Sequence, residues 1–217
     1  MLAHQRFQGS KAEFQGLGLK QVFEKIHSTN LWGSRDSVSG PGSELESTAR
    51  LRQMLPRFLS DLGIRTLLDI PCGDFQWLSE TALPVERYIG ADIVEDVVRR
   101  NRELYDREFV RLDLCSDPLP RADLVLCRDC LVHLSNQNIF RAVNNLTASG
   151  SEWLLTTHFL ECRNNEDIQD GDWRLLNFKL PPFGWPEPER LLVEGCQESG
   201  GGYADKSLAL WRVSDLR

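Results

Sequence analysis

The spacing of hydrophobic residues changes along the chain and predicts its elements. Leucines at helical spacing predict a helix from Ser43 to Leu62, and a shorter helix is expected within 12–27. After Gly63, short apolar runs alternate with segments of helical spacing, which predict helices over 94–104 and 136–146. The apolar runs predict strands at 66–70, 87–91, 109–112, 122–127, 152–158, 191–194 and 207–213.

Strands that alternate with helices indicate a mostly parallel sheet with helices on both faces. The run Leu124–Cys127 is entirely apolar, which is typical of a strand buried on both sides. The sequence therefore predicts an α/β fold.

Two helix starts carry capping signals. Ser43 is a suitable N-cap, and Glu46 three residues later completes a capping box. Pro56 lies inside the helix that follows, so we expect this helix to kink or restart there. Ser135 is expected to cap the helix of residues 136–146.

Residues 1–43 differ from the rest because they are rich in Gly, Ser and Gln. We expect them to form a cap or lid, and residues 44–217 to form the main domain. Within that domain, residues 160–190 contain prolines and aromatic residues that do not suit a crossover helix. This insertion is either a substrate-binding loop or an ordinary packed excursion of the chain.

Acidic residues stand at the ends of three predicted strands: Asp69, Asp92 and Asp113. In an open α/β sheet, ligands bind beyond these carboxyl ends. A carboxylate after the second strand can accept both ribose hydroxyls of a nucleoside, and Gly73 after the first strand allows close approach of a ligand. Both features fit a nicotinamide dinucleotide or an adenosyl cofactor.

The turn after the first strand separates these two cofactors. A dinucleotide site has the pattern G-x-G-x-x-G, whereas Gly73 is the only glycine here and lies beside Pro71 and Asp74. Carboxylates would repel a pyrophosphate, but they would attract the sulfonium and ammonium groups of S-adenosylmethionine. The turn therefore favours the methyl donor.

The motifs LLDIPCGDF, YIGADIV, FVRLDL and DLVLCRDCLVHLS resemble the successive motifs of class I S-adenosylmethionine-dependent methyltransferases, over about residues 64–160. The resemblance implies a Rossmann-like, doubly wound, mostly parallel seven-stranded sheet with an antiparallel last strand. It implies contacts of Asp69 and Gly73 with the methionine part, of Asp92 with the ribose, and of Asp113 and Leu114 with the adenine. It also implies that Arg128, at the end of the fourth strand, faces both cofactor and substrate, and that Pro71, Asp74 and Ile93 belong to the cofactor site.

The first turn departs from the pattern of the family, because Pro71 and Phe75 replace the outer glycines of G-x-G-x-G. The path of this loop is therefore expected to differ. Other parts of the chain are similar to a little-characterised bacterial subgroup of these enzymes: the SGPGS loop, DGDWRLLNF, PPF and ADKSLALW.

Candidate catalytic residues follow the fourth and fifth strands. His133 and His158 could each deprotonate an acceptor hydroxyl, since histidine titrates near neutrality; each could equally be a packed structural histidine. Asp129 could act as a base, orient His133, or form a salt bridge with Arg128. Trp32 and Trp173 could stack on a sugar or aromatic acceptor.

The cysteines give little support for a metal site. Cys127-x-x-Cys130 is a single pair without a second pair at suitable spacing, which is weak evidence for zinc or redox chemistry. We therefore predict no metal, although Asp129, His133 and His158 together leave a magnesium-assisted reaction open.

Composition narrows the class of function. The chain has 25 Lys and Arg against 32 Asp and Glu among 217 residues, a net charge of −7. This charge argues against nucleic-acid binding. The apolar runs are much shorter than the ~20 residues of a membrane-spanning helix, and the first residues lack an apolar leader-like stretch. We therefore expect a cytoplasmic protein with reduced cysteines and no membrane span.

The leading hypothesis is O-methylation of a small molecule or a glycan. Two alternatives stay open: a nicotinamide-dependent oxidoreductase, and a non-catalytic module that binds S-adenosylmethionine.

Overall fold

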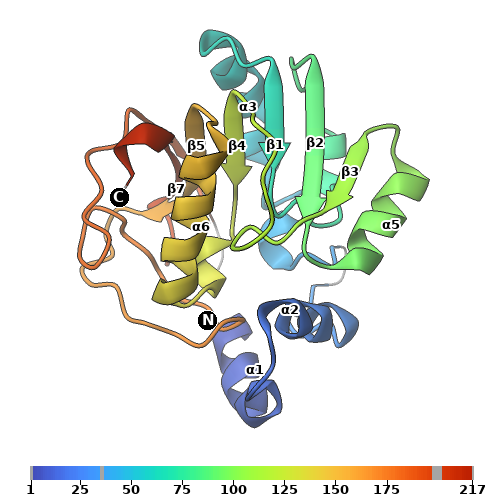
Figure 1. The fold of residues 1–217 in the computed structure, drawn as a ribbon, viewed down its shortest axis with the longest axis vertical. Coiled ribbons are helices and arrows are strands. Elements are labelled where there is room, and N and C mark those ends of the chain that lie inside the picture. Colours follow the sequence, from blue (N-terminus) through green and yellow to red (C-terminus); the bar gives the residue numbers. More distant parts are fainter. Residues whose placement is uncertain (1, 35–36, 197–201, 217) are drawn as a thin grey trace.

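The computed structural model describes residues 2–34, 37–196 and 202–216 and contains one seven-stranded sheet (Figure 1). The strand order is β3-β2-β1-β4-β5-β7-β6. The strands are β1 (Thr66–Asp69), β2 (Arg87–Asp92), β3 (Glu108–Arg111), β4 (Leu124–Cys127), β5 (Trp153–Phe159), β6 (Arg190–Val193) and β7 (Lys206–Arg212).

The register of the sheet confirms the expected architecture. Strands β1 to β5 pair in parallel, and β7 pairs antiparallel with both β5 and β6. Each predicted strand is present, with its ends within two residues of the expected positions. The sheet is therefore doubly wound and mostly parallel, with an antiparallel last strand.

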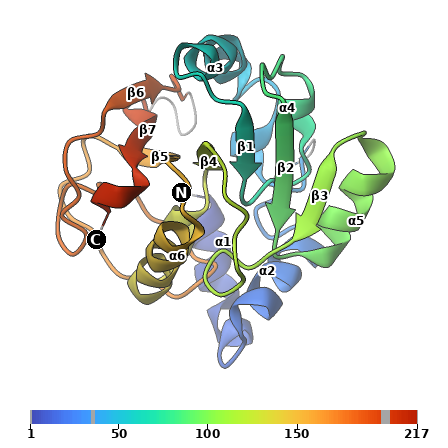
Figure 2. The same ribbon diagram turned by 45° about the horizontal axis from the view of Figure 1, so that its top comes forward.

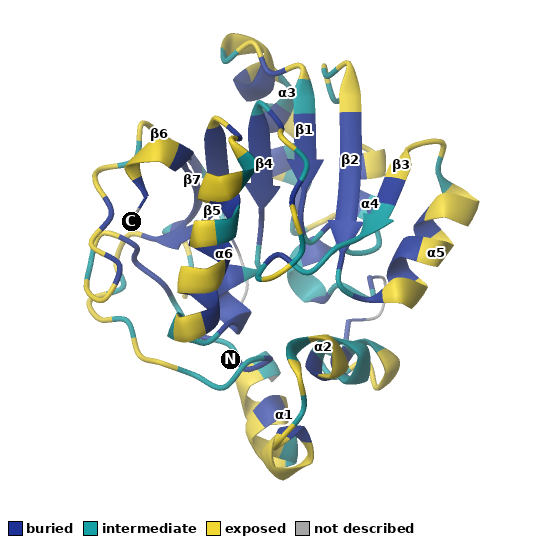
Figure 3. Cartoon of the chain, in the orientation of Figure 1, coloured by how far each residue is buried: buried dark blue, intermediate teal, exposed yellow. Residues whose placement is uncertain are grey.

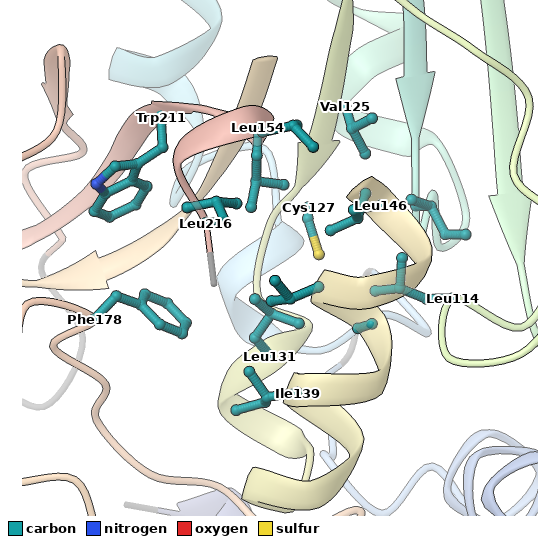
Figure 4. Packing of buried hydrophobic residues seen from close by; sticks show 14 of the residues in the cluster. Leu114, Val125, Cys127, Leu131, Ile139, Leu146, Leu154, Phe178, Trp211 and Leu216 are labelled. Carbon is teal, nitrogen blue, oxygen red and sulfur yellow. The ribbon is translucent and has the colours of Figure 1, made fainter. Parts of the chain in front are cut away.

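Alternate residues of the strands pack against helices on opposite faces of the sheet. Leu68 and Val125 belong to a core with α6 (Asn136–Ser149), whereas Leu67 and Leu124 belong to a core with α3 (Ala49–Asp61). The two short helices α4 (Gln76–Ser79) and α5 (Glu95–Leu104) contribute to the second core. Figure 3 shows the central strands as the buried layer, and Figure 4 shows the α6 side of the core.

Helix α6 begins as the sequence predicts. The side chain of Ser135 accepts a hydrogen bond from the backbone N–H of Asn138, which satisfies one of the unpaired donors of the first turn. The helix ends at Gly150, whose φ of +68° is the left-handed conformation favoured by glycine.

Helix α3 corrects the expected cap and the expected restart at Pro56. It begins at Ala49 after Thr48, so Ser43 is not its cap; Ser43 ends a separate 3-10 turn, Pro41–Ser43. Pro56 lies within one continuous helix, so the helix does not restart there. Pro56 is the eighth of the 13 helical residues, and its missing N–H removes one backbone hydrogen bond to the preceding turn.

The N-terminal residues contain more helix than expected. The short helix expected within 12–27 is α2 (Leu19–Ser28), and it is preceded by α1 (Leu2–Ser10) and a 3-10 turn, Lys11–Phe14. Phe7, Phe14, Val22 and Ile26 form a small core of their own. The parallel strands point toward α1 and α2, so these helices lie across the carboxyl edge of the sheet (Figures 1 and 2).

No helix among the described residues is long and apolar enough to cross a membrane.

Candidate active site

A pocket with about 1060 Å³ of empty space, part of it open to solvent, lies at the carboxyl edge of the sheet. The loops after β1, β2, β3 and β4 form one side, while α2 and the segment around Trp32 and Ser39 form the other. The N-terminal residues thus complete the site that the sheet begins. The α2 wall is largely apolar and comprises Leu19, Phe23, Ile26 and His27.

Twelve of the fourteen residues predicted for the site line this pocket: Trp32, Asp69, Pro71, Gly73, Asp74, Asp92, Ile93, Asp113, Leu114, Arg128, Asp129 and His133. The other two, His158 and Trp173, do not line it.

Asp69 ends β1 as a buried carboxyl group. The hydroxyl of Tyr88 donates a hydrogen bond to it over 2.7 Å. Burial raises the pKa of Asp69 to about 8, although the Tyr88 bond acts in the opposite direction. The charge of Asp92 raises this pKa further and that of Arg128 lowers it, so a cationic ligand would act in the same direction as Arg128.

The loop after β1 is held by residues on both sides. Gly73 has a φ of +53°, and a Cβ there would lie 2.2 Å from the hydroxyl oxygen of Ser39, so only glycine fits. Ser39 in turn accepts a hydrogen bond from the N–H of Asp74, whose carboxylate accepts one from the N–H of Val38. The segment before α3 is thus fastened over the loop.

Asp92 ends β2 and orients the same loop. Its carboxylate accepts hydrogen bonds from the N–H groups of Gly73 at 3.1 Å and Val94 at 2.9 Å. Burial raises the pKa of Asp92 to about 6, and the two backbone bonds oppose this shift. Asp92 and Asp69 are therefore two buried carboxyl groups that face one pocket.

Asp113 shapes the loop after β3. Its side chain accepts a hydrogen bond from the N–H of Cys115 at 2.8 Å, and its own N–H donates to Asp117. The carbonyl oxygen of Leu114 accepts a hydrogen bond from Asn145. These contacts fix the part of the pocket where the sequence predicts the adenine ring.

Arg128 joins three parts of the site. Its guanidinium group forms a buried ion pair with Glu194 at 2.7 Å and donates to the carbonyl oxygen of Gly42 at 2.9 Å. It also lies over the ring of Trp77, 5.4 Å from the centroid. Glu194, just after β6, was not predicted from the sequence because nothing local relates it to Arg128, 66 residues earlier.

Asp129 is an ion-paired carboxylate, which argues against its expected role as a base. Lys206 lies 2.7 Å and Arg128 3.2 Å from its Oδ2 atom. Burial disfavours ionisation, but these two cations outweigh it and hold the pKa of Asp129 below its ordinary value. The salt bridge anticipated as the simpler explanation is present, and the described partners of Asp129 do not include His133.

His133 is a buried histidine that lines the pocket. Its Nδ1 atom donates a hydrogen bond to the carbonyl oxygen of Asp172 at 2.8 Å, because a carbonyl can only accept. Burial lowers the pKa of His133 to about 4, so the ring is neutral at pH 7. Nε2 therefore carries the lone pair, and it has no hydrogen-bond partner within the described ranges.

His158 corrects the second catalytic expectation. Its side chain is fully buried, its Nδ1 accepts a hydrogen bond from the N–H of Phe178, and its ring packs on Phe178 and Trp211. Side chains of a strand alternate between faces, and His158 turns into the core beneath the 160–190 segment. It is a structural histidine.

Trp173 likewise corrects an expectation. It packs edge-on against Phe159 and Tyr203 and contributes to the core on the α6 side. Residues 160–189 form no helix or strand, and this segment reaches the site through Asp172 rather than through Trp173.

The cysteines give no sign of a metal centre. No group of three or more His, Cys, Asp or Glu in the described part of the chain could hold a metal ion. A hydrogen bond with Cys127 and burial raise the pKa of the Cys130 thiol well above its ordinary value. Both effects favour the protonated thiol.

Comparisons by sequence identify no relative: no protein-family model and no curated protein matches the chain.

Comparisons of structure do find similar proteins. The N-methyltransferase NodS from Bradyrhizobium japonicum, in complex with S-adenosyl-L-homocysteine, has a TM-score of 0.59 at 15% identity, covering 89% of this chain and 97% of that chain. The methyltransferase domain of bacterial CtHen1 has a TM-score of 0.55 at 14% identity, covering 78% and 98%. At these identities the likeness shows the fold, so the chain has the fold of the class I S-adenosylmethionine-dependent methyltransferases.

Proposed function

We propose that this protein is a methyltransferase that uses S-adenosylmethionine to methylate the hydroxyl group of a small molecule or a glycan precursor. The observation that carries the proposal is the meeting of Asp69, Asp92 and Asp113 in one pocket of a methyltransferase fold. These residues come from the ends of three neighbouring strands.

The pocket suits a cationic adenosyl ligand. Asp69 and Asp92 are buried and have raised pKa values of about 8 and about 6, so a nearby positive charge would stabilise their ionised forms. Asp69 and Gly73 would hold the methionine part, Asp92 the ribose, and Asp113 with Leu114 the adenine. The bound cofactor would supply a methyl group on a sulfonium.

The acceptor would enter between α2 and His133. His133 presents an unprotonated Nε2, which can take the proton of a hydroxyl group. Leu19, Phe23 and Ile26 give this side an apolar wall, which favours an acceptor with apolar surface. We assign residues 1–43 the role of a cap and the segment 160–190 the role of supporting the acceptor side.

Calorimetry tests the cofactor directly. We expect S-adenosylmethionine and S-adenosylhomocysteine to bind, and Asp92→Asn to weaken binding about tenfold to a hundredfold because a charge-assisted hydrogen bond is lost. Asp96→Asn, on the exposed face of α5, is the matched control. Failure of the folded wild-type protein to bind either compound would refute the proposal, and stabilisation by NADH instead would favour an oxidoreductase.

Methyl transfer tests the base. With labelled S-adenosylmethionine and a panel of phenols, alcohols, amines and sugars, we expect transfer to oxygen. His133→Gln should lower the rate by about two to four orders of magnitude and leave S-adenosylhomocysteine affinity unchanged. His158→Gln is the matched control and should retain the rate. Transfer to amines alone would show that the acceptor atom is nitrogen rather than oxygen. Tight binding of S-adenosylmethionine with no transfer would indicate a non-catalytic binding module.

We also propose a cytoplasmic location and no nucleic-acid partner. Cys72, Cys115, Cys127, Cys130 and Cys162 are free thiols, as expected in a reducing compartment, and the net charge of −7 disfavours contact with phosphate backbones.

A further inference from the structure

Residues 171–174 lie alongside the 3-10 turn Leu131–His133 after β4. The N–H of Gly171 donates to the carbonyl oxygen of His133 at 2.8 Å, and the N–H of Arg174 donates to that of Val132 at 3.2 Å. Between these two bonds, the carbonyl oxygen of Asp172 accepts the Nδ1–H of His133. The backbone of this segment therefore selects the tautomer of His133 and limits rotation of its ring.

Whereas the backbone carbonyl of Asp172 contacts His133, its side chain contacts helix α1. Its carboxylate accepts hydrogen bonds from His4 Nδ1 at 2.8 Å and Gln8 Nε2 at 2.7 Å, and one from the N–H of Trp173 at 2.8 Å. Asp172 is only 3% exposed. A buried carboxylate with these partners is costly to move, because any new position would leave it unpaired.

The same segment is packed closely against the N-terminal helices. A Cβ on Gly171 would lie 2.7 Å from Val22, 2.9 Å from Ile26 and 3.0 Å from Phe7. Helix α2 in turn supplies the apolar wall of the pocket. The cap and the segment 171–174 are thus one packed unit, which contacts the imidazole ring of His133 through the carbonyl oxygen of Asp172 and the indole of Trp32.

We infer that Asp172 is a positioning residue: by anchoring α1 through its carboxylate and His133 through its carbonyl oxygen, it makes the orientation of the base depend on the docking of the N-terminal cap. Its catalytic significance rests on the proposed function. The role of the Asp172 carbonyl oxygen in orienting the imidazole ring of His133 does not depend on the proposed function.

Nitrogen-15 NMR of histidine tests this inference without an acceptor. The wild-type protein should show His133, assigned from the His133→Gln spectrum, as one Nδ1-protonated tautomer. Asp172→Ala should give a mixture of tautomers, whereas Asp172→Asn should largely keep the wild-type form because its carbonyl oxygen still accepts the N–H of Trp173. Gln8→Ala, which removes one donor from α1, should give a smaller shift in the same direction.

Asp170→Asn is the matched control. Asp170 lies two residues away, but its carboxylate accepts from Ser135 and Asn138 at the start of α6 and not from α1. It should lower the melting temperature and leave the tautomer of His133 unchanged. The same tautomer in Asp172→Ala and Gln8→Ala as in the wild type would overturn the inference; Gln8→Ala decides it if Asp172→Ala does not fold.

Transfer assays separate this inference from the proposed function. On any acceptor of the panel that is methylated, Asp172→Ala should slow transfer about tenfold to a hundredfold by misplacing the base, with S-adenosylhomocysteine affinity unchanged by calorimetry. A rate equal to that of Asp170→Asn would contradict a positioning role. If no acceptor is methylated, the transfer assay counts against the proposed function. The NMR measurement of the His133 tautomer still tests the inference about Asp172.

Discussion

The imidazole ring of His133 stacks on the indole ring of Trp32, with centroids 4.7 Å apart and an interplanar angle of 30°. Gly40 packs against the same indole, since a Cβ there would lie 3.6 Å from its Cε3 atom. The face of Trp32 that contacts His133 is therefore closed to an acceptor. Trp32 and Asp172 hold the imidazole from two sides.

Replacing Trp32 should loosen His133 without removing the cofactor site. We expect Trp32→Ala to lower methyl transfer about tenfold or more, because a loosely held base spends less time in a productive orientation. Trp32→Phe keeps an aromatic ring and should recover most of the rate. Transfer rates and calorimetry with S-adenosylhomocysteine measure the two effects; equal rates for both variants would argue against the stack as the cause.

The affinity for S-adenosylmethionine should rise with pH. Asp69 has a pKa of about 8 in the free protein, so near pH 7 it is largely protonated, and a bound cation would favour its ionised form. The complex then holds fewer protons than the free protein, and affinity increases as pH rises toward 8, by up to about tenfold per pH unit.

Calorimetry in buffers of different ionisation enthalpy should detect the released proton. Asp69→Asn, which has no proton to release, should show a flatter profile, with only the contribution of Asp92, whose pKa is about 6. A wild-type affinity that falls between pH 6 and pH 8 would contradict this linkage.

The ion pair of Arg128 and Glu194 should be sensitive to loss of one partner. Their side chains are 5% and 2% exposed, so Arg128→Met would leave a buried carboxylate with only the more distant Lys206, 3.7 Å away. We expect a loss of about 3–5 kcal/mol in the free energy of unfolding. In denaturant titrations, the double variant Arg128→Met, Glu194→Gln should lose less than the sum of the single losses.

Gly171→Ala should undock the N-terminal helices. Its φ of +93° and the close contacts of its Cβ with Val22, Ile26 and Phe7 predict a loss of about 2–4 kcal/mol. Gly184→Ala is the matched control in the same segment, because its φ is +61° but nothing lies within 4 Å of its Cβ. It should cost about 1–2 kcal/mol, as strain alone does. Thermal melting of both variants measures the difference.

Some features of this protein follow from local sequence. The strands were predictable because burial on a sheet requires short apolar runs, and the cap of α6 because Ser135 acts on a backbone group three residues away. The meeting of Asp69, Asp92 and Asp113 in one pocket was predictable because the carboxyl ends of neighbouring parallel strands lie at one edge of the sheet.

The acceptor side was decided by the tertiary structure. His133 follows β4 and His158 lies near the end of β5, and local sequence does not separate them, yet one lines the pocket and the other is buried in the core. The start of α3 was misjudged at Ser43 because a capping pattern competes with the turn that fastens residues 37–43 over the β1 loop. Local pattern cannot weigh such a distant contact.

The sequence by itself determined the sheet, because strands follow from periodicity. It also determined which carboxylates stand at the carboxyl edge of the sheet, because they follow the apolar runs directly. Only the tertiary structure decided which histidine lines the pocket and what holds its ring. Those contacts join Asp172 to His4 across 168 residues and Arg128 to Glu194 across 66. Packing and charge pairing over such separations depend on the whole fold, and no local pattern encodes them.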